Sequence, residues 1–317
     1  MKPIPAHLLA RVTSVFLFVS VASLHWSGWW RLVKGTTSLL NPPIIVFYIA
    51  ILVAFWASIS AWRQQKTFLW RRIWLALLLV PASIIIEAFW RQKFGVPDLG
   101  SILSIWAPSR IILFGSIMMA AFFVLALVTR DESAYAQRFF SGLALASAVD
   151  MGLIALNPFL PIGPNHIIGF WGAGVMAMVY VSGLLIANRK IPGAAASTVI
   201  SMMLVVLYSL GIERVSPVLS AGQGVIPPWI LAFSFVIPAA ANDLLHSVQF
   251  MARGFIIGFL WSGLLIGLSA LFFEPQFQYS LEKIIQAVVA SGIGGMVAAL
   301  LLMLFQTERS LYHYPAS

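Results

Sequence analysis

Long apolar stretches alternate with short polar connections along the whole chain. About 20 apolar residues in a helix are enough to cross the hydrocarbon core of a bilayer. The period-2 alternation of barrel strands is absent, and only helices or closed barrels pair all backbone groups in lipid. The pattern therefore predicts an all-α, polytopic transmembrane helical bundle, arranged as repeated helix hairpins in one integral-membrane domain. We expect ten spans, at about 8–26, 43–62, 70–90, 108–129, 138–157, 164–187, 194–212, 227–248, 254–273 and 283–305.

The composition supports a protein embedded in lipid. Hydrophobic residues make up 61% of the chain and charged residues 9%, whereas a soluble domain carries about 25% charged residues. The net charge is +9, but the basic residues stand singly or in pairs at span ends. They therefore indicate membrane topology rather than nucleic-acid binding. Because the chain has no cysteine, disulfides, iron–sulfur clusters and thiolate zinc sites are excluded.

The basic residues also predict an orientation. Lysine and arginine are enriched in the cytoplasmic loops of membrane proteins. Of the 19 basic residues, twelve lie at the termini or in connections on the same side, and seven lie on the opposite side. We therefore expect both termini in the cytoplasm, with the chain in a bacterial inner membrane.

A recurrent hairpin places an acidic or polar residue before a loop and a proline after it. The clearest copy is Ser147–Gly172, in which Asp150 lies near the end of one apolar stretch and a proline-rich loop leads to the next. Similar units begin at Ser27, Glu87 and Glu213. All of them would lie opposite the termini, as a parallel repeat of two-helix hairpins. Proline is also an ordinary residue at a helix start, because the N–H that it lacks would have no partner there.

Small residues predict close helix packing in the second half of the chain. Glycines that are four residues apart, or that cluster within one span, let transmembrane helices approach closely. The residues concerned are Gly169, Gly172, Gly174, Gly254, Gly258, Gly263, Gly267, Gly292, Gly294 and Gly295.

Three polar residues of the Ser147–Gly172 hairpin form a candidate metal site. Asp150 lies about two turns before Asn157, and His166 opens the next span. An ionised side chain within a bilayer costs about 2.5–3.5 kcal/mol, so it needs a partner or a role. A short loop would bring the three side chains to one pocket, where a carboxylate, an amide oxygen and an imidazole can bind copper, iron or zinc. The alternative is a buried Asp–His pair that only fixes the hairpin.

Other polar groups lie within the predicted spans. Asp243 and His246 are three residues apart and would share a helix face, either as part of an ion or proton path or as a cap at the membrane interface. Glu87 and Arg91 are four residues apart and are expected to pair with each other. His25 lies near an interface, where an isolated histidine suggests no role.

Short motifs in the Asp150 hairpin connect the chain to a known family. Asp150 is followed by Gly163–Ile168, which reads Gly-Pro-Asn-His-Ile-Ile. In these residues the chain resembles the C-type membrane subunit of particulate methane and ammonia monooxygenases, which has Asp-x3-His and then Pro-Ser-His-Ile-Ile. Ile154 occupies the place of the middle histidine. Glu87–Arg91 and Pro158–His166 are similar to Glu-Trp-x-Asn-Arg and a proline-rich stretch ending Ala-Pro-Leu-His in the A-type subunit.

The resemblance implies a copper-dependent membrane monooxygenase subunit that lacks one ligand at Ile154. Our leading hypothesis is therefore a membrane scaffold or accessory subunit of a larger membrane complex, with copper below full occupancy. A second hypothesis is an active metal-dependent monooxygenase-type subunit with its site at Asp150 and His166. A third is an ion- or proton-coupled transporter that uses Asp150, Asp243 and His246.

Overall fold

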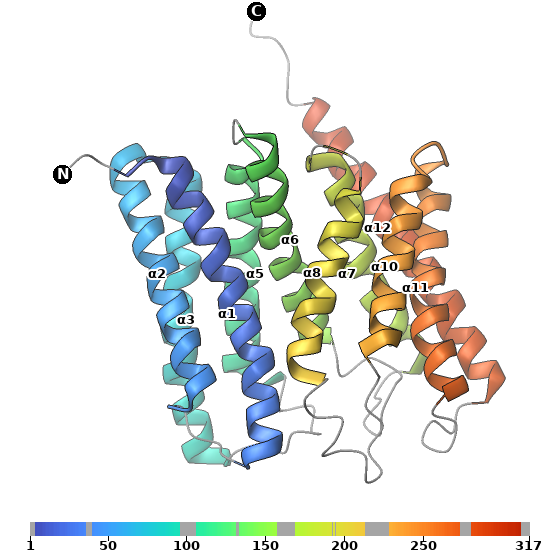
Figure 1. Cartoon of the computed structure of the whole chain (residues 1–317), viewed down its shortest axis with the longest axis horizontal. Coiled ribbons are helices and arrows are strands. Elements are labelled where there is room, and N and C mark those ends of the chain that lie inside the picture. The colour runs from blue at the N-terminus through green and yellow to red at the C-terminus, as the bar shows by residue number, and fades with distance from the viewer. Residues whose placement is uncertain are drawn as a thin grey trace, which may run out of the picture.

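The structure is a computed structural model that describes residues 4–35, 40–95, 106–130, 133–156, 169–191, 193, 195–212, 228–272 and 280–311. Over these residues the chain forms ten α-helices and no strand, so the predicted all-α bundle is confirmed. Each of the ten predicted spans overlaps one helix. The helices are α1 (Ala6–Lys34), α2 (Pro42–Gln65), α3 (Phe68–Phe94), α5 (Pro108–Val128), α6 (Ala134–Leu156), α7 (Gly169–Lys190), α8 (Ala196–Ile212), α10 (Pro228–Leu244), α11 (Phe250–Phe272) and α12 (Leu281–Leu311) (Figure 1).

The lengths and surfaces of these helices suit a bilayer. Eight of the helices in the described part of the chain are long and apolar enough to cross a membrane. The other two, α8 and α10, have 17 residues each, which is near the lower limit of about 17 residues for a span. Large apolar side chains such as Leu52, Trp56 and Leu271 are exposed on the bundle, where lipid chains can cover them. The chain is an integral membrane protein with many spans.

Prolines begin three of the described helices, α2, α5 and α10. Pro42 and Pro43 open α2, and the side chain of Asn41 accepts a hydrogen bond of 3.0 Å from the backbone N–H of Ile44. Pro108 likewise stands in the first turn of α5. Here the proline motifs act as helix starts, because the first turn has no intrahelical partner for the missing N–H.

The helices pack as two groups of five. In the first group (α1, α2, α3, α5 and α6), the first helix contacts the second, fourth and fifth, and each later helix contacts the next. The same relations hold in the same order in the second group (α7, α8, α10, α11 and α12), where α7 also contacts α10. The groups lie side by side in Figure 1 and meet where α6 contacts α7 and α8, and where α1 contacts α8.

Because five is an odd number, the second group crosses the membrane in the opposite direction to the first. α1 begins and α12 ends on one side of the bundle, called here the terminal side, whereas α6 ends and α7 begins on the far side (Figure 1). The two helices of each predicted hairpin are in contact. The hairpins are therefore parts of a larger five-helix pattern that is present twice with inverted orientation.

Glycines bring helices of the second group to backbone distance. A Cβ atom added at Gly258 of α11 would lie 2.2 Å from the carbonyl oxygen of Ser291 in α12. One added at Gly294 of α12 would lie 2.0 Å from the carbonyl oxygen of Gly174 in α7. The predicted close packing is confirmed at these positions. Gly267 differs, because a Cβ atom there would have no neighbour within 4 Å.

Candidate functional site

Asp150 is buried in α6 and pairs with a histidine of α1. Its carboxylate oxygen Oδ2 lies 2.9 Å from Nε2 of His25. Asp150 is 0% exposed, and the side chain of His25 is 11% exposed. The second carboxylate oxygen, Oδ1, is buried and has no hydrogen-bond partner among the residues that the structure describes. An unpaired buried acceptor is costly, so Oδ1 requires a partner that the described residues do not supply.

The Asp150–His25 pair lies at the junction of the two helix groups. The ring of His25 in α1 has its centroid 5.1 Å from that of Tyr208 in α8. Tyr208 in turn lies 5.5 Å from the ring of Phe235 in α10. The pair is nearer to the far side, since Asp150 is six residues before Leu156 at the end of α6, or about 9 Å along the helix.

Aromatic side chains fill the middle of the second group. The hydroxyl of Tyr180 lies 3.2 Å from Oγ of Ser201 and donates a hydrogen bond of 2.5 Å to the backbone oxygen of Phe235. The ring of Tyr180 lies 5.2 Å from that of Phe235 and 5.5 Å from that of Trp261. All four of these residues are buried, so the centre of this group is closely packed and largely apolar.

The predicted metal hairpin falls only partly within the described residues. Asn157 and His166 lie outside them, so a metal bound by Asp150, Asn157 and His166 stays a prediction. The contact of Asp150 that the structure does describe is His25 on another helix. Ile154, at the place of the middle ligand, packs against the hydrophobic core. Within the described ranges, no group of three His, Asp or Glu side chains is arranged to hold a metal ion.

His25 is the residue of this site that sequence reasoning missed. It lies 125 positions from Asp150, so no local spacing links the two. The predicted first span ended at residue 26, which placed His25 at the membrane interface. The helix instead continues to Lys34, which places His25 within the bundle. A carboxylate within a membrane span needs a partner, and this requirement of Asp150 was the signal that could have led to His25.

A second polar cluster lies on the terminal side, where α8 begins. Asp243 of α10 accepts hydrogen bonds from the backbone N–H groups of Ser197 (3.1 Å) and Thr198 (3.0 Å), and from the hydroxyl of Thr198 (2.7 Å). The first N–H groups of a helix have no intrahelical partner, and a carboxylate there also complements the helix dipole. Asp243 therefore caps α8 from a neighbouring helix.

Asn242 connects this cap to α7 and α11. Its side-chain amide donates to the carbonyl oxygen of Leu184 at 3.1 Å and to Oγ of Ser197 at 2.7 Å. Its oxygen Oδ1 accepts a hydrogen bond of 2.6 Å from Nε of Arg253. Asn188 donates to the backbone oxygen of Asn242 at 3.1 Å. The cluster thus joins four helices through buried polar contacts.

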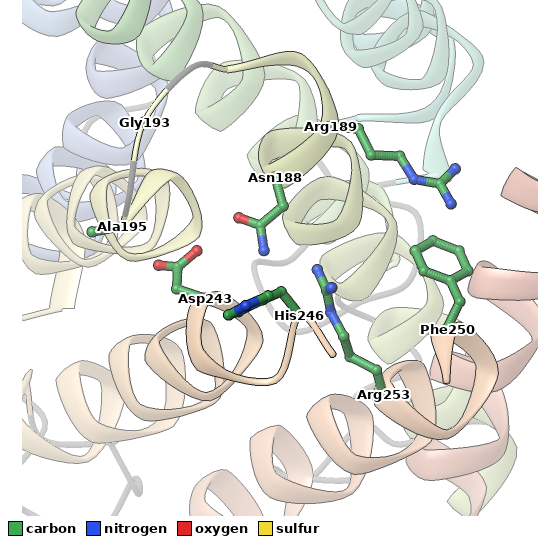
Figure 2. Close-up of a pocket in the computed structure, with 8 residues that line it drawn as sticks. All are labelled: Asn188, Arg189, Gly193, Ala195, Asp243, His246, Phe250 and Arg253. Carbon is green, nitrogen blue, oxygen red and sulfur yellow. The ribbon is translucent and has the colours of Figure 1, made fainter. Parts of the chain in front are cut away.

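His246 lies beyond the end of its helix. The sequence predicted that it shares a helix face with Asp243, within a span from 227 to 248. That expectation is wrong, because α10 ends at Leu244 and His246 lies in the turn that leads to α11. His246 and Asp243 nevertheless line the same pocket (Figure 2).

Replacing Asp243 by alanine is expected to lower the thermal stability of the purified protein in mild detergent. The change leaves two backbone N–H groups of α8 without their acceptor, and a hydrogen bond to a charged group contributes about 1.5–3 kcal/mol. Asp243→Asn keeps one acceptor oxygen, so its loss of stability should be smaller. Equal thermal midpoints for Asp243→Ala and the unmodified protein would contradict the capping role.

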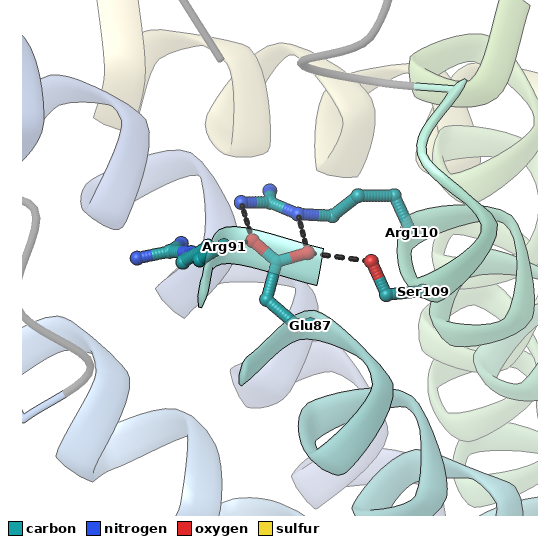
Figure 3. Close-up of polar contacts among 4 residues, drawn as sticks. All are labelled: Glu87, Arg91, Ser109 and Arg110. Atoms are coloured by element: carbon teal, nitrogen blue, oxygen red, sulfur yellow. Dashed lines mark hydrogen bonds and ion pairs between the residues drawn. The ribbon is translucent and has the colours of Figure 1, made fainter. Parts of the chain in front are cut away.

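A third cluster surrounds Glu87 on the far side of the bundle (Figure 3). Its oxygen Oε1 lies 2.7 Å from Nε of Arg91 and 3.2 Å from a terminal guanidinium nitrogen of Arg110. Its oxygen Oε2 accepts a hydrogen bond of 2.5 Å from the hydroxyl of Ser109 and lies 3.5 Å from Nε of Arg110. The expected pairing of Glu87 with Arg91 is present, and α5 supplies a second arginine that the sequence did not predict.

The Glu87 and Asn242 clusters occupy equivalent places in the two helix groups. In the first group, Glu87 near the end of α3 contacts Arg110 in the first turn of α5. In the second group, Asn242 near the end of α10 contacts Arg253 in the first turn of α11. The third helices, α3 and α10, also share an internal proline, Pro81 or Pro238, a few residues earlier. Because the groups are inverted, one cluster lies on the far side and the other on the terminal side.

Comparison of the chain with protein-family models, with curated proteins and with solved structures gives no match.

Proposed function

We propose that the protein is a proton-coupled secondary transporter of a small polar solute. The observation that carries this proposal is the buried Asp150–His25 pair, which lies between two helix groups of opposite orientation. Ion and substrate sites of transporters lie at the interface between such repeats. Ionisable residues buried in a membrane protein are typical of ion and proton pathways.

The chemistry of the pair suits proton transfer. Histidine is the side chain whose charge changes nearest to physiological pH. Its Nε2 faces a carboxylate oxygen at 2.9 Å, so a proton gained by the pair changes its net charge by one unit. A change of charge at a buried site alters how strongly the surrounding helices hold together, which couples protonation to a change of conformation.

Polar side chains on one face of α8 connect the two ends of the bundle. Ser197, Ser201 and Tyr208 are separated by four and seven residues and so lie on one stripe of the helix. Ser197 contacts the Asp243 and Asn242 cluster, Ser201 contacts Tyr180, and Tyr208 contacts His25. This stripe supports a route for a polar solute along α8, which the aromatic residues of the second group close in the present conformation.

The internal prolines give further support. Helices interrupted by proline or glycine at corresponding positions of two inverted repeats are a typical feature of transporter binding regions. Pro81 and Pro238 have this relation in α3 and α10. Each removes a backbone hydrogen bond and so provides a place where the helix can bend.

The proposal is tested with purified protein reconstituted into lipid vesicles that contain a pH-sensitive dye. Amino acids, sugars, nucleosides and small carboxylic acids are added one at a time under an imposed pH gradient. We expect at least one class to be accumulated together with a change in internal pH, which protein-free vesicles do not show. Absence of solute-dependent proton movement in every class would contradict the proposal.

The hypotheses of an accessory subunit and of a monooxygenase predict other results. An accessory subunit should be isolated in mild detergent together with stoichiometric membrane partners and should show no transport alone. A monooxygenase-type subunit should carry close to one copper per chain, which Asp150→Ala and His166→Ala should both remove. Metal analysis and mass spectrometry of the purified material, together with the vesicle assay, therefore distinguish all three functions.

A further inference from the structure

A pocket of about 250 Å³ lies on the terminal side, between the ends of α7 and α10 and the starts of α8 and α11. Its lining includes Arg189, Arg253 and His246, together with Asn188 and Asp243 (Figure 2). Two of these side chains are permanently cationic, and a histidine can become so. The volume is small, so the pocket fits one compact polar group.

Arg253 is the central feature of this pocket. Arg253 is only 7% exposed, and an arginine is seldom so deeply buried unless it is paired. Its Nε is held by Asn242 at 2.6 Å, and this bond fixes the plane of the guanidinium group. Its two terminal nitrogens have no hydrogen-bond or ion-pair partner among the described residues, and they point toward the centre of the pocket in Figure 2.

The acidic side chain in the lining does not supply the missing partner. Both carboxylate oxygens of Asp243 accept hydrogen bonds from the start of α8. In the described part of the chain, Asp243 makes no ion pair with Arg253. Arg189 is held over the ring of Phe250, with 3.9 Å between its guanidinium carbon and the ring centroid. The pocket therefore contains one more positive charge than negative charge before His246 is counted.

We infer that this pocket binds a phosphate group. A guanidinium group with two free terminal nitrogens matches the oxygens of phosphate in a bidentate manner. Arg189 and His246 add donors on the same rim, which suits an anion that carries more than one charge. The phosphate can belong to a free anion or to the headgroup of a phospholipid at the membrane surface. This inference does not rest on the transport proposal, because it concerns binding alone.

The first experiment measures binding of inorganic phosphate to the purified, full-length protein in detergent. Titration calorimetry and thermal unfolding are carried out at constant ionic strength, with chloride as the reference anion. For a free anion we expect saturable stabilisation by phosphate, and at least tenfold weaker binding in Arg253→Gln. Arg130→Gln, which changes an exposed arginine after the end of α5, should bind as the unmodified protein does.

The second experiment identifies a lipid ligand. Phospholipid that remains with the purified protein is measured by native mass spectrometry and phosphorus analysis. For a lipid headgroup we expect a retained phospholipid that Arg253→Gln loses and Arg130→Gln keeps. Arg189→Gln, in which the changed side chain is exposed, provides a second variant if Arg253→Gln does not fold. The inference would be overturned if the protein bound no phosphate and retained no phospholipid that depends on Arg253.

Discussion

Replacing Asp150 by asparagine is expected to abolish proton-coupled uptake while the folded protein is retained. Asparagine has nearly the same size and keeps an acceptor oxygen, but it cannot exchange a proton. His25 can remain in place as a neutral ring, so no unpaired charge is left in the bundle. We therefore expect proton-coupled uptake to fall to the background of protein-free vesicles. Uptake per folded molecule and the thermal midpoint in detergent are measured together.

Ser147→Ala is the matched control for this experiment. Ser147 is also buried in α6, three residues before Asp150, and its hydroxyl donates to the backbone oxygen of Leu143 at 2.8 Å. Its loss should leave uptake unchanged. His25→Gln should reproduce the loss of uptake seen in Asp150→Asn. A lower thermal midpoint with unchanged uptake in Asp150→Asn would instead show that the Asp150–His25 pair is a structural hydrogen bond.

Replacing Glu87 by alanine is expected to produce a large loss of stability. Glu87 is 7% exposed, and it contacts the guanidinium groups of Arg91 and Arg110. Without the carboxylate, Arg91 and Arg110 lose the counter-charge that they share. Removing one member of a buried ion pair costs about 3–5 kcal/mol. The free energy of unfolding, or the thermal midpoint in mild detergent, should fall accordingly.

Glu282→Ala is the control for the loss of a glutamate. Glu282 lies in the first turn of α12 and is exposed, and it accepts a hydrogen bond of 3.0 Å from the side chain of Gln286. Exposed polar pairs contribute about 0–1 kcal/mol, so this variant should be close to the unmodified protein. Combining Glu87→Gln with Arg110→Met removes the negative charge of Glu87 and the positive charge of Arg110, and this double variant should recover part of the stability. Equal stability of Glu87→Ala and Glu282→Ala would contradict the structural role of the cluster.

The sequence was sufficient to predict the helices, because lipid imposes a simple rule on composition and length. Every predicted span overlaps a helix, and the helix that begins at Pro108 was placed correctly by its proline. The glycines at 258 and 294 indicated close packing, since their spacing on one helix face is a local property. Glu87 and Arg91 were paired correctly for the same reason, as they are one turn apart.

Contacts between distant helices could not be predicted in this way. The partner of Asp150 depends on how α1 packs against α6, and nothing in the local pattern determines that packing. Asp243 caps α8, whose first residue, Ala196, lies 47 positions earlier in the chain. The twofold five-helix pattern also escaped detection, because it is visible in contacts between helices and not in repeated residues.

The glycine contacts of the second group determine which parts of the protein can move. With Gly258 against Ser291, and Gly294 against Gly174, α7, α11 and α12 have no room to slide over one another. We expect these three helices to move together. In the first group, an added Cβ atom at Gly28 or Gly115 would meet nothing within 4 Å, but one at Gly152 of α6 would lie 2.8 Å from a side-chain carbon of Val179 in α7. The two groups are therefore closely packed where α6 meets α7, and we expect relative motion of the groups to require repacking of this contact, two residues from Asp150.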